Sequence, residues 1–217
     1  LRAFGRFLDT LGGRYLVTTD VGSTGRDLEY ISQETQYVVG LPITAGGSGD
    51  TSIMTGLGIY MGMKACAKEV WGTDSLKGKR VAMQGFGKVA TYTAHHLIKE
   101  DSQIVVTDID EEALDRARKL GLPVVAPDEI YDVECDIFSP CALGGVINPD
   151  TIPRITARVI AGGANNQLLT EADGEELHRR GVLYAPDYLI NAGGIINVSA
   201  EIGTPYSADR AREKTER

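Results

Sequence analysis

The sequence has 217 residues, of which 42% are hydrophobic and 24% are charged, values typical of an ordinary globular protein. Its net charge of −8 argues against nucleic acid or an anionic membrane surface as the main partner. No apolar run approaches the ~20 residues of a membrane-spanning helix, and no signal peptide is visible, so we expect a cytoplasmic protein without membrane contact.

The first part of the chain is predicted to form the edge of one domain. Its helices follow from the spacing of apolar residues, and its strand, "RYLVTTD", from β-branched residues. The predicted elements are a helix over 1–11, a strand over 14–20, a helix over 24–34, a loop over 46–50 and a long helix over 51–70 between two lobes. We assign residues 1–39 to the C-terminal edge of a substrate or catalytic domain.

From residue 79 onward, short apolar strands alternate with helices. The predicted strands are 80–84, 104–108, 124–125, 137–139, 159–161 and 182–185, and helices are predicted over 88–99 and 111–120. This alternation indicates an α/β fold, a doubly wound parallel sheet of Rossmann type. We assign residues 40–217 to this second domain, with its core at 79–203. The chain begins at Leu1 in a helical pattern and ends in a polar helical run without a stop signal, so we expect an internal fragment of a longer protein.

The stretch "GFGKVA" lies between a predicted strand and a predicted helix and fits the pattern GxGxx(G/A). Gly85 would make the tight turn, Gly87 would let the backbone approach a pyrophosphate, and Ala90 would let the helix pack on the sheet. Asp108 ends the next strand and would accept hydrogen bonds from ribose hydroxyls, while repelling a 2′-phosphate. The stretch therefore predicts a site for NAD rather than NADP; the alternative is a plain tight turn beside a surface acid.

Two charged residues near this loop have open interpretations. Lys88 begins the helix and either contacts a phosphate or is simply solvated. Asp110 is the rival ribose partner, but it precedes two glutamates and is favoured as a helix N-cap.

Other polar residues follow predicted strands. Asp20, at the end of the first strand, is a candidate general acid and base, and the alternative is a turn or capping residue. Asn165 and Asn191 each stand beside glycines, in "AGGANNQL" and "LINAGG", and would present an amide to nicotinamide or substrate unless they are turn residues. The stretch "FSPCALGGVIN" also lies where ligands bind in such folds.

The cysteines and histidines do not suggest a metal site. The three cysteines, Cys66, Cys135 and Cys141, lack CxxC spacing, which favours reduced thiols in a cytosolic protein. The three histidines lack HExxH or similar spacing, so no metal cofactor is predicted.

Taken together, the motifs resemble the Glu/Leu/Phe/Val dehydrogenase family. They occur in one order over nearly the whole chain, and they lean toward the leucine and valine (branched-chain) enzymes. The motifs are "RYLVTTDVGST", "GMKACAKEVWG", "GFGKVA", "VTDID", "CDIFSPCALGG", "VIAGGANNQL" and "YAPDYLINAGGIINV".

The resemblance implies a function and a set of site residues. The implied reaction is NAD-dependent oxidative deamination of a branched-chain L-amino acid, in branched-chain amino acid catabolism, by a homo-oligomer. Asp20 matches the catalytic aspartate, which moves protons to and from water and ammonia. Asn191 matches an asparagine near the substrate amino group and nicotinamide, and Thr55 matches a threonine that contacts the nicotinamide amide. Val39 matches a position near the substrate. The residues implied at the coenzyme are Gly85, Phe86, Gly87, Lys88, Val89, Ala90, Asp108, Cys141, Ala142, Asn165 and Asn166.

The match has departures. The family's catalytic lysine lies in an upstream glycine-rich stretch that these 217 residues do not contain, and Lys64 matches a packing segment instead. We therefore expect this chain by itself to bind NAD at best and not to turn over substrate. Thr19 replaces a glutamate beside the catalytic aspartate. Two alternatives stay open: a non-catalytic NAD-binding module, and a phenylalanine or glutamate dehydrogenase of the same family.

Overall fold

The computed structural model describes residues 1–20, 22–203 and 205–217. It has two compact units. The first comprises Leu1–Met54 and Gly194–Arg217, and the second comprises Thr55–Gly193. The predicted domain border between residues 39 and 40 stays a prediction.

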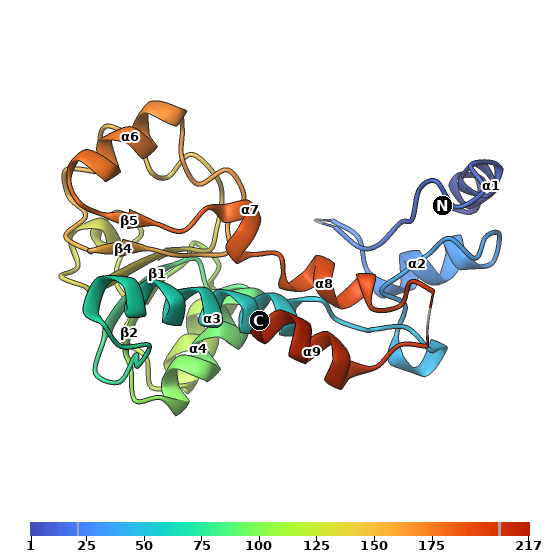
Figure 1. Ribbon diagram of the computed structural model, residues 1–217, viewed down its shortest axis with the longest axis horizontal. Coiled ribbons are helices and arrows are strands. Elements are labelled where there is room, and N and C mark those ends of the chain that lie inside the picture. Colours follow the sequence, from blue (N-terminus) through green and yellow to red (C-terminus); the bar gives the residue numbers. More distant parts are fainter. Residues whose placement is uncertain (21, 204) are drawn as a thin grey trace. The chain divides into compact units, whose positions relative to one another are not determined.

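The second unit is built on a parallel five-stranded sheet with the order β2-β1-β3-β4-β5, counted over its described residues (Figure 1). In the register of this sheet, Val81 of β1 pairs with Ile104 of β2 on one side and with Ile137 of β3 on the other. The strands are β1 (Arg80–Gln84), β2 (Gln103–Thr107), β3 (Ile137–Pro140), β4 (Val159–Ile160) and β5 (Leu183–Tyr184). The predicted α/β fold with a parallel sheet is confirmed.

Helices cover both faces of this sheet because successive strand residues point to opposite sides. Val81 and Met83 pack with buried residues of α3, α4 and α5, whereas Ala82 and Phe138 pack with those of α6 and η2. The covering helices are α3 (Ser52–Trp71), α4 (Lys88–Lys99), α5 (Glu111–Lys119), η2 (Glu129–Asp132) and α6 (Glu171–Arg179), and the short α7 (Asp187–Ile190) follows β5. Both faces are buried, which explains why the strands are nearly continuous apolar runs.

Helices α3 and α4 approach closely because α3 carries glycine at the contact. A Cβ atom on Gly56 would lie 2.6 Å from the Cβ of Tyr92 and 3.0 Å from the backbone nitrogen of Thr93. The Thr93 hydroxyl donates to the Gly56 carbonyl oxygen at 3.3 Å. This contact fixes the helix that follows the glycine loop against its neighbour.

The first unit has a small core of its own. Helices α1 (Arg2–Thr10) and α2 (Gly25–Ser32) bury Leu8, Leu28 and Ile31 together with Val38. The remaining elements are η1 (Ile43–Ala45), α8 (Gly193–Ser199) and α9 (Ala208–Glu216). Glu201 links segments distant in the sequence: its Oε1 accepts the backbone N–H groups of Gly40 at 2.9 Å and Ser48 at 2.8 Å.

Two strand predictions were wrong. The predicted strand over 14–20 is reduced to a single bridge, in which Val17 pairs with Val38, and the strand over 124–125 is a bridge between Val124 and Val106. β-branched residues favour an extended backbone, but a strand also needs a partner along its length, and the pairing at these segments is confined to one residue each. No helix in the described part of the chain is long and apolar enough to cross a bilayer.

Candidate functional site

The glycine loop joins β1 to α4, and its shape depends on a backbone position that suits only glycine. Gly85 has φ of +93°, a backbone conformation that strains other residues. A Cβ atom there would also lie 2.7 Å from the Cβ of Ala142 and 2.8 Å from its backbone nitrogen. The turn therefore brings the loop after β1 against the loop after β3.

The amino end of α4 is open to a ligand. Gly87 is its N-cap, has an extended backbone and makes no capping hydrogen bond through a side chain. A Cβ atom at Gly87 would meet nothing within 4 Å, so this position is open space. The first N–H groups of a helix have no acceptor within it and attract anions. The loop thus fits a dinucleotide pyrophosphate, with Lys88 exposed at the first helical position.

Asp108 stands directly after β2 and holds the glycine loop. Its Oδ2 accepts the N–H of Phe86 at 2.6 Å, and its Oδ1 accepts those of Ile109 at 2.7 Å and Asp110 at 2.9 Å. The carboxylate is therefore fixed at the glycine loop. Asp110 is the N-cap of α5 and accepts the N–H of Glu112 at 3.1 Å, which confirms the interpretation as a cap.

Three other residues predicted at the coenzyme have side chains that pack against the rest of the protein. Phe86 and Ala90 are buried in the core of the sheet, so Phe86 can meet a ligand only through its backbone. Val89 lies beside the segment after β4, where a Cβ atom on Gly163 would come within 3.2 Å of its Cγ1. These residues shape the loop rather than line it.

Asn165, Asn191 and Cys141 form a second group of linked residues, a wall of polar side chains in the segments that follow β3, β4 and β5. The side-chain nitrogen of Asn191 donates to the side-chain oxygen of Asn165 at 2.6 Å and to the Gly163 carbonyl oxygen at 3.4 Å. Cys141 Sγ lies 3.3 Å from the Ser139 hydroxyl and accepts the N–H of Gly163 at 3.5 Å. Burial raises the pKa of the Cys141 thiol, so this side chain is a neutral polar contact. Segments that follow β3, β4 and β5 thus meet at one edge of the sheet.

Asn166 and Asp187 complete this wall. Asn166 has φ of +52° and donates its backbone N–H to Asp187 Oδ2. Asp187 Oδ1 accepts the N–H of Tyr188 at 2.8 Å. The carboxylate therefore ties α7 to the loop that carries the two asparagines.

The remaining predicted residues belong to different units. Asp20 and Val39 lie in the first unit, and Thr55 lies in the second with the coenzyme loop. Asp20 is exposed, and its backbone N–H and carbonyl both bond to the Ser23 hydroxyl, at 2.7 and 2.8 Å. Val39 is buried. The catalytic role of Asp20 and the substrate contact of Val39 stay predictions.

Sequence reasoning missed three residues that hold these segments: Asp187, Glu201 and Arg116. Arg116 lies on α5, and its guanidinium donates to the Phe86 carbonyl oxygen at 3.3 Å. Each is a charged residue bonded to backbone atoms at least 20 positions away, as the pairs Asp187–Asn166, Glu201–Ser48 and Arg116–Phe86 show. A weak signal existed only for Asp187, which follows a proline at the start of a helix.

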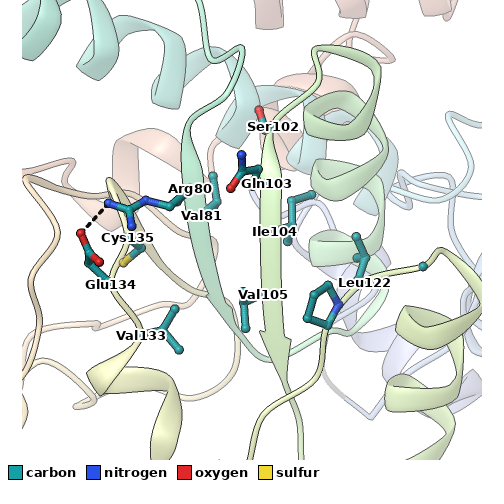
Figure 2. Close-up of a pocket in the computed structure, with 12 residues that line it drawn as sticks. Arg80, Val81, Ser102, Gln103, Ile104, Val105, Leu122, Val133, Glu134 and Cys135 are labelled. Atoms are coloured by element: carbon teal, nitrogen blue, oxygen red, sulfur yellow. Dashed lines mark hydrogen bonds and ion pairs between the residues drawn. The ribbon is translucent and has the colours of Figure 1, made fainter.

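A cavity of about 400 Å³ lies at the opposite edge of the sheet (Figure 2). Arg80 and Gln103, the first residues of β1 and β2, line it, and the Arg80 guanidinium pairs with Glu134 at 2.9 Å. Parallel strands end at the same edge, so the glycine loop is remote from this cavity. The described residues also contain no cluster of three or more His, Cys, Asp or Glu side chains suited to a metal ion.

Comparison with known proteins agrees with this geometry. The chain matches the model of the family described as Glutamate/Leucine/Phenylalanine/Valine dehydrogenase over residues 46–114 and 107–214. It is 52% identical to a leucine dehydrogenase of Geobacillus stearothermophilus and 42% identical to a phenylalanine dehydrogenase of Caldalkalibacillus thermarum, in each case over 99% of this chain and 59% of the relative.

The fold has a close counterpart among solved structures. The L-tryptophan dehydrogenase of Nostoc punctiforme superimposes with a TM-score of 0.82 at 43% identity, over 99% of this chain and 61% of that one. The chain thus spans about three fifths of the length of these relatives. Because the family model covers most of the sequence, the chain belongs to the Glutamate/Leucine/Phenylalanine/Valine dehydrogenase family.

Proposed function

We propose that the protein containing this chain is an NAD-dependent amino acid dehydrogenase that oxidatively deaminates a branched-chain L-amino acid to its 2-oxo acid and ammonia. The observation that carries the proposal is the open amino end of α4 at the glycine loop, in a chain that is 52% identical to a leucine dehydrogenase over nearly its whole length. The reaction is reversible as reductive amination.

The glycine loop supports NAD as the coenzyme. Gly87 leaves space for a pyrophosphate at the helix terminus, and the Asp108 carboxylate lies beside the same loop. A carboxylate there attracts ribose hydroxyls and repels a 2′-phosphate, which favours NAD over NADP. When bound, NAD would accept a hydride from the substrate carbon that carries the amino group.

The chain's own residues would orient the reactants and move protons. The joined amides of Asn165 and Asn191 form a polar wall where the nicotinamide end would extend. Asp20 would act as general base toward the attacking water and as general acid toward the departing ammonia. This role rests on the family resemblance.

We also propose that the whole protein is a cytoplasmic homo-oligomer. Light scattering on the purified gene product would test its oligomeric state.

An aromatic substrate is the second candidate, because phenylalanine and tryptophan dehydrogenases are 42% and 43% identical to this chain. Val39 is buried and apolar, which suits an aliphatic substrate side chain. One methylene more or less on a substrate bound in a hydrophobic pocket is worth only ~1–3 kcal/mol, so specificity has to be measured.

The test is NADH consumption by the gene product that contains this chain, with ammonia and one of four oxo acids. 4-Methyl-2-oxopentanoate and 3-methyl-2-oxobutanoate are expected to react faster than phenylpyruvate and 2-oxoglutarate. Asp20→Asn should lower kcat by a factor of about 10²–10⁴. Asp209→Asn is the matched control, since Asp209 is an exposed carboxylate on α9 of the same unit.

Each contrary result points to a different function. Faster reaction with phenylpyruvate would move the assignment to the aromatic enzymes. NADH binding without consumption of any oxo acid would favour a non-catalytic NAD-binding module. Activity that is unchanged in Asp20→Asn would exclude the proposed proton transfer.

A further inference from the structure

The backbone of Phe86 is held at both of its polar atoms by side chains from the next strand and helix. Asp108 Oδ2 accepts its N–H at 2.6 Å, and Arg116 Nη2 donates to its carbonyl oxygen at 3.3 Å. The Phe86 side chain is 0% exposed. Three anchors therefore hold a single residue in the middle of the coenzyme loop.

These anchors matter because Phe86 lies between two glycines. Gly85 adopts φ of +93°, and Gly87 is an exposed N-cap without side-chain capping. Glycine has the largest backbone freedom of any residue, so a loop of this composition does not hold its own orientation. Fixing both polar atoms of Phe86 sets the direction of the N–H groups that follow at the start of α4.

Because its N–H is already bonded to Asp108, Phe86 does not supply that donor to a phosphate. The donors for the pyrophosphate come from the next residues, at the first turn of α4. Their position depends on the peptide that Arg116 and Asp108 hold. A pre-formed loop does not have to be ordered when the ligand arrives, which increases affinity.

We propose that Arg116 is a positioning residue for the coenzyme: it holds the Phe86 carbonyl group and so orders the glycine loop before NAD binds. This inference rests on the proposed function. It assigns Arg116 no contact with the reacting atoms. Asp108 then has two tasks, as the partner of the Phe86 N–H and as the acid beside the ribose.

The same helix provides a matched control. Arg118, two residues further along α5, pairs with Glu111 at 2.5 Å and with Asp115 at 2.8 Å, and about half of its side chain is exposed. Its removal takes the same charge from the same helix without touching the loop. A change in general electrostatics would affect the two variants equally.

The experiment compares the Arg116→Gln, Arg116→Lys and Arg118→Gln variants with wild type, all made in the gene product that contains this chain. NADH affinity is measured by fluorescence titration, hydrogen exchange is measured for the amides of residues 86–89 without coenzyme, and melting temperature reports folding. We expect Arg116→Gln to weaken NADH binding about tenfold, as loss of a hydrogen bond from a charged group would. Exchange at residues 86–89 should become faster, Arg116→Lys should recover part of both effects, and Arg118→Gln should bind NADH as tightly as wild type.

The possible outcomes distinguish failure of this inference from failure of the proposed function. A wild-type gene product that does not bind NADH contradicts the proposed function and the inference together. Wild-type binding with an Arg116→Gln variant of equal affinity and equal loop exchange overturns the inference alone. If Arg116→Gln fails to fold, the Arg116→Lys variant tests the proposal. Faster amide exchange at residues 86–89 than in wild type supports it. Exchange that is equal to or slower than that of wild type overturns it.

Discussion

The side-chain nitrogen of Asn191 donates to the side-chain oxygen of Asn165 at 2.6 Å, across the two loops that form one wall of the proposed coenzyme site. Each asparagine fixes the orientation of the other's amide. The Asn191 nitrogen also reaches the Gly163 carbonyl oxygen, at 3.4 Å. The two amides therefore present a fixed set of donors and acceptors, rather than a pair of side chains that rotate independently.

Removing Asn165 should release Asn191. We expect Asn165→Ala to lower kcat/KM of the gene product by about tenfold, since one hydrogen bond and one orientation are lost. Steady-state rates at varied oxo acid concentration measure this effect. Asn148→Ala is the control, because within the described part of the chain the Asn148 side chain bonds inside its own turn, to the Gly145 carbonyl oxygen and to the N–H groups of Asp150 and Thr151. Equal kcat/KM values in Asn165→Ala and wild type would show that the pairing does not serve the reaction.

The two glycines of the loop should respond differently to alanine. Gly85→Ala places a Cβ atom 2.7 Å from that of Ala142 at a left-handed backbone position, so it should destabilise folding by about 1–3 kcal/mol and weaken NADH binding. Gly87→Ala meets open space at φ of −70° and should fold normally, yet weaken NADH binding by crowding the phosphate. Urea unfolding and NADH titration distinguish the two effects. Tight NADH binding by Gly87→Ala would contradict the placement of the pyrophosphate.

Asp187 should stabilise a strained loop. Asn166 adopts φ of +52°, and its N–H is accepted by the Asp187 carboxylate. Asp187→Asn keeps the shape but removes the charge, so we expect a loss of about 1–2 kcal/mol in the free energy of unfolding and a fall in kcat/KM. Asn166→Gly is the companion variant, because glycine adopts this backbone without strain and should restore part of the stability in the double variant. No recovery would argue that strain at residue 166 is not what Asp187 offsets.

Glu100 should make stability depend on pH in acid. Burial by itself raises the pKa of this carboxyl, but hydrogen bonds from the Tyr60 hydroxyl at 2.6 Å, the Leu76 N–H at 2.9 Å and the Lys64 ammonium at 3.2 Å lower it below the ordinary value of 4.5. A lowered folded pKa contributes stability above the unfolded pKa, and that stability is lost as pH falls through the folded pKa. The free energy of unfolding measured in urea should therefore decrease as pH falls from about 5 to about 3.

The Glu100→Gln variant tests this dependence. Its unfolding free energy should be lower at pH 7 by about 1–3 kcal/mol and should change less between pH 5 and pH 3. Glu69→Gln, which alters an exposed carboxylate on α3, should behave like wild type. A Glu100→Gln variant with the same slope as wild type would show that this network does not cause the acid sensitivity.

The sequence predicted the features whose signals are local. The strand before Gly85, the helix after it and the acid at Asp108 all follow from short-range patterns, and the structure has each of them. Residues 14–20 have strand composition, but their pairing is confined to the bridge at Val17, a fact that depends on a distant partner. The role of Asp187 could not be predicted for the same reason, because its partner Asn166 becomes a neighbour only after the sheet is assembled.

The strand order determines where the sheet opens to a ligand. β1 lies between β2 and β3 in the sheet. From β1 the chain passes through α4 to β2 on one side, and it then crosses back to form β3 on the other side of β1. Such a reversal opens a crevice at the carboxyl ends of the two central strands, whatever side chains are present. The proposed place of the coenzyme then follows from chain connectivity, whereas the asparagine wall sets the polar contacts made there. Evolution or design can thus retune the chemistry at this crevice without rebuilding the fold that creates it.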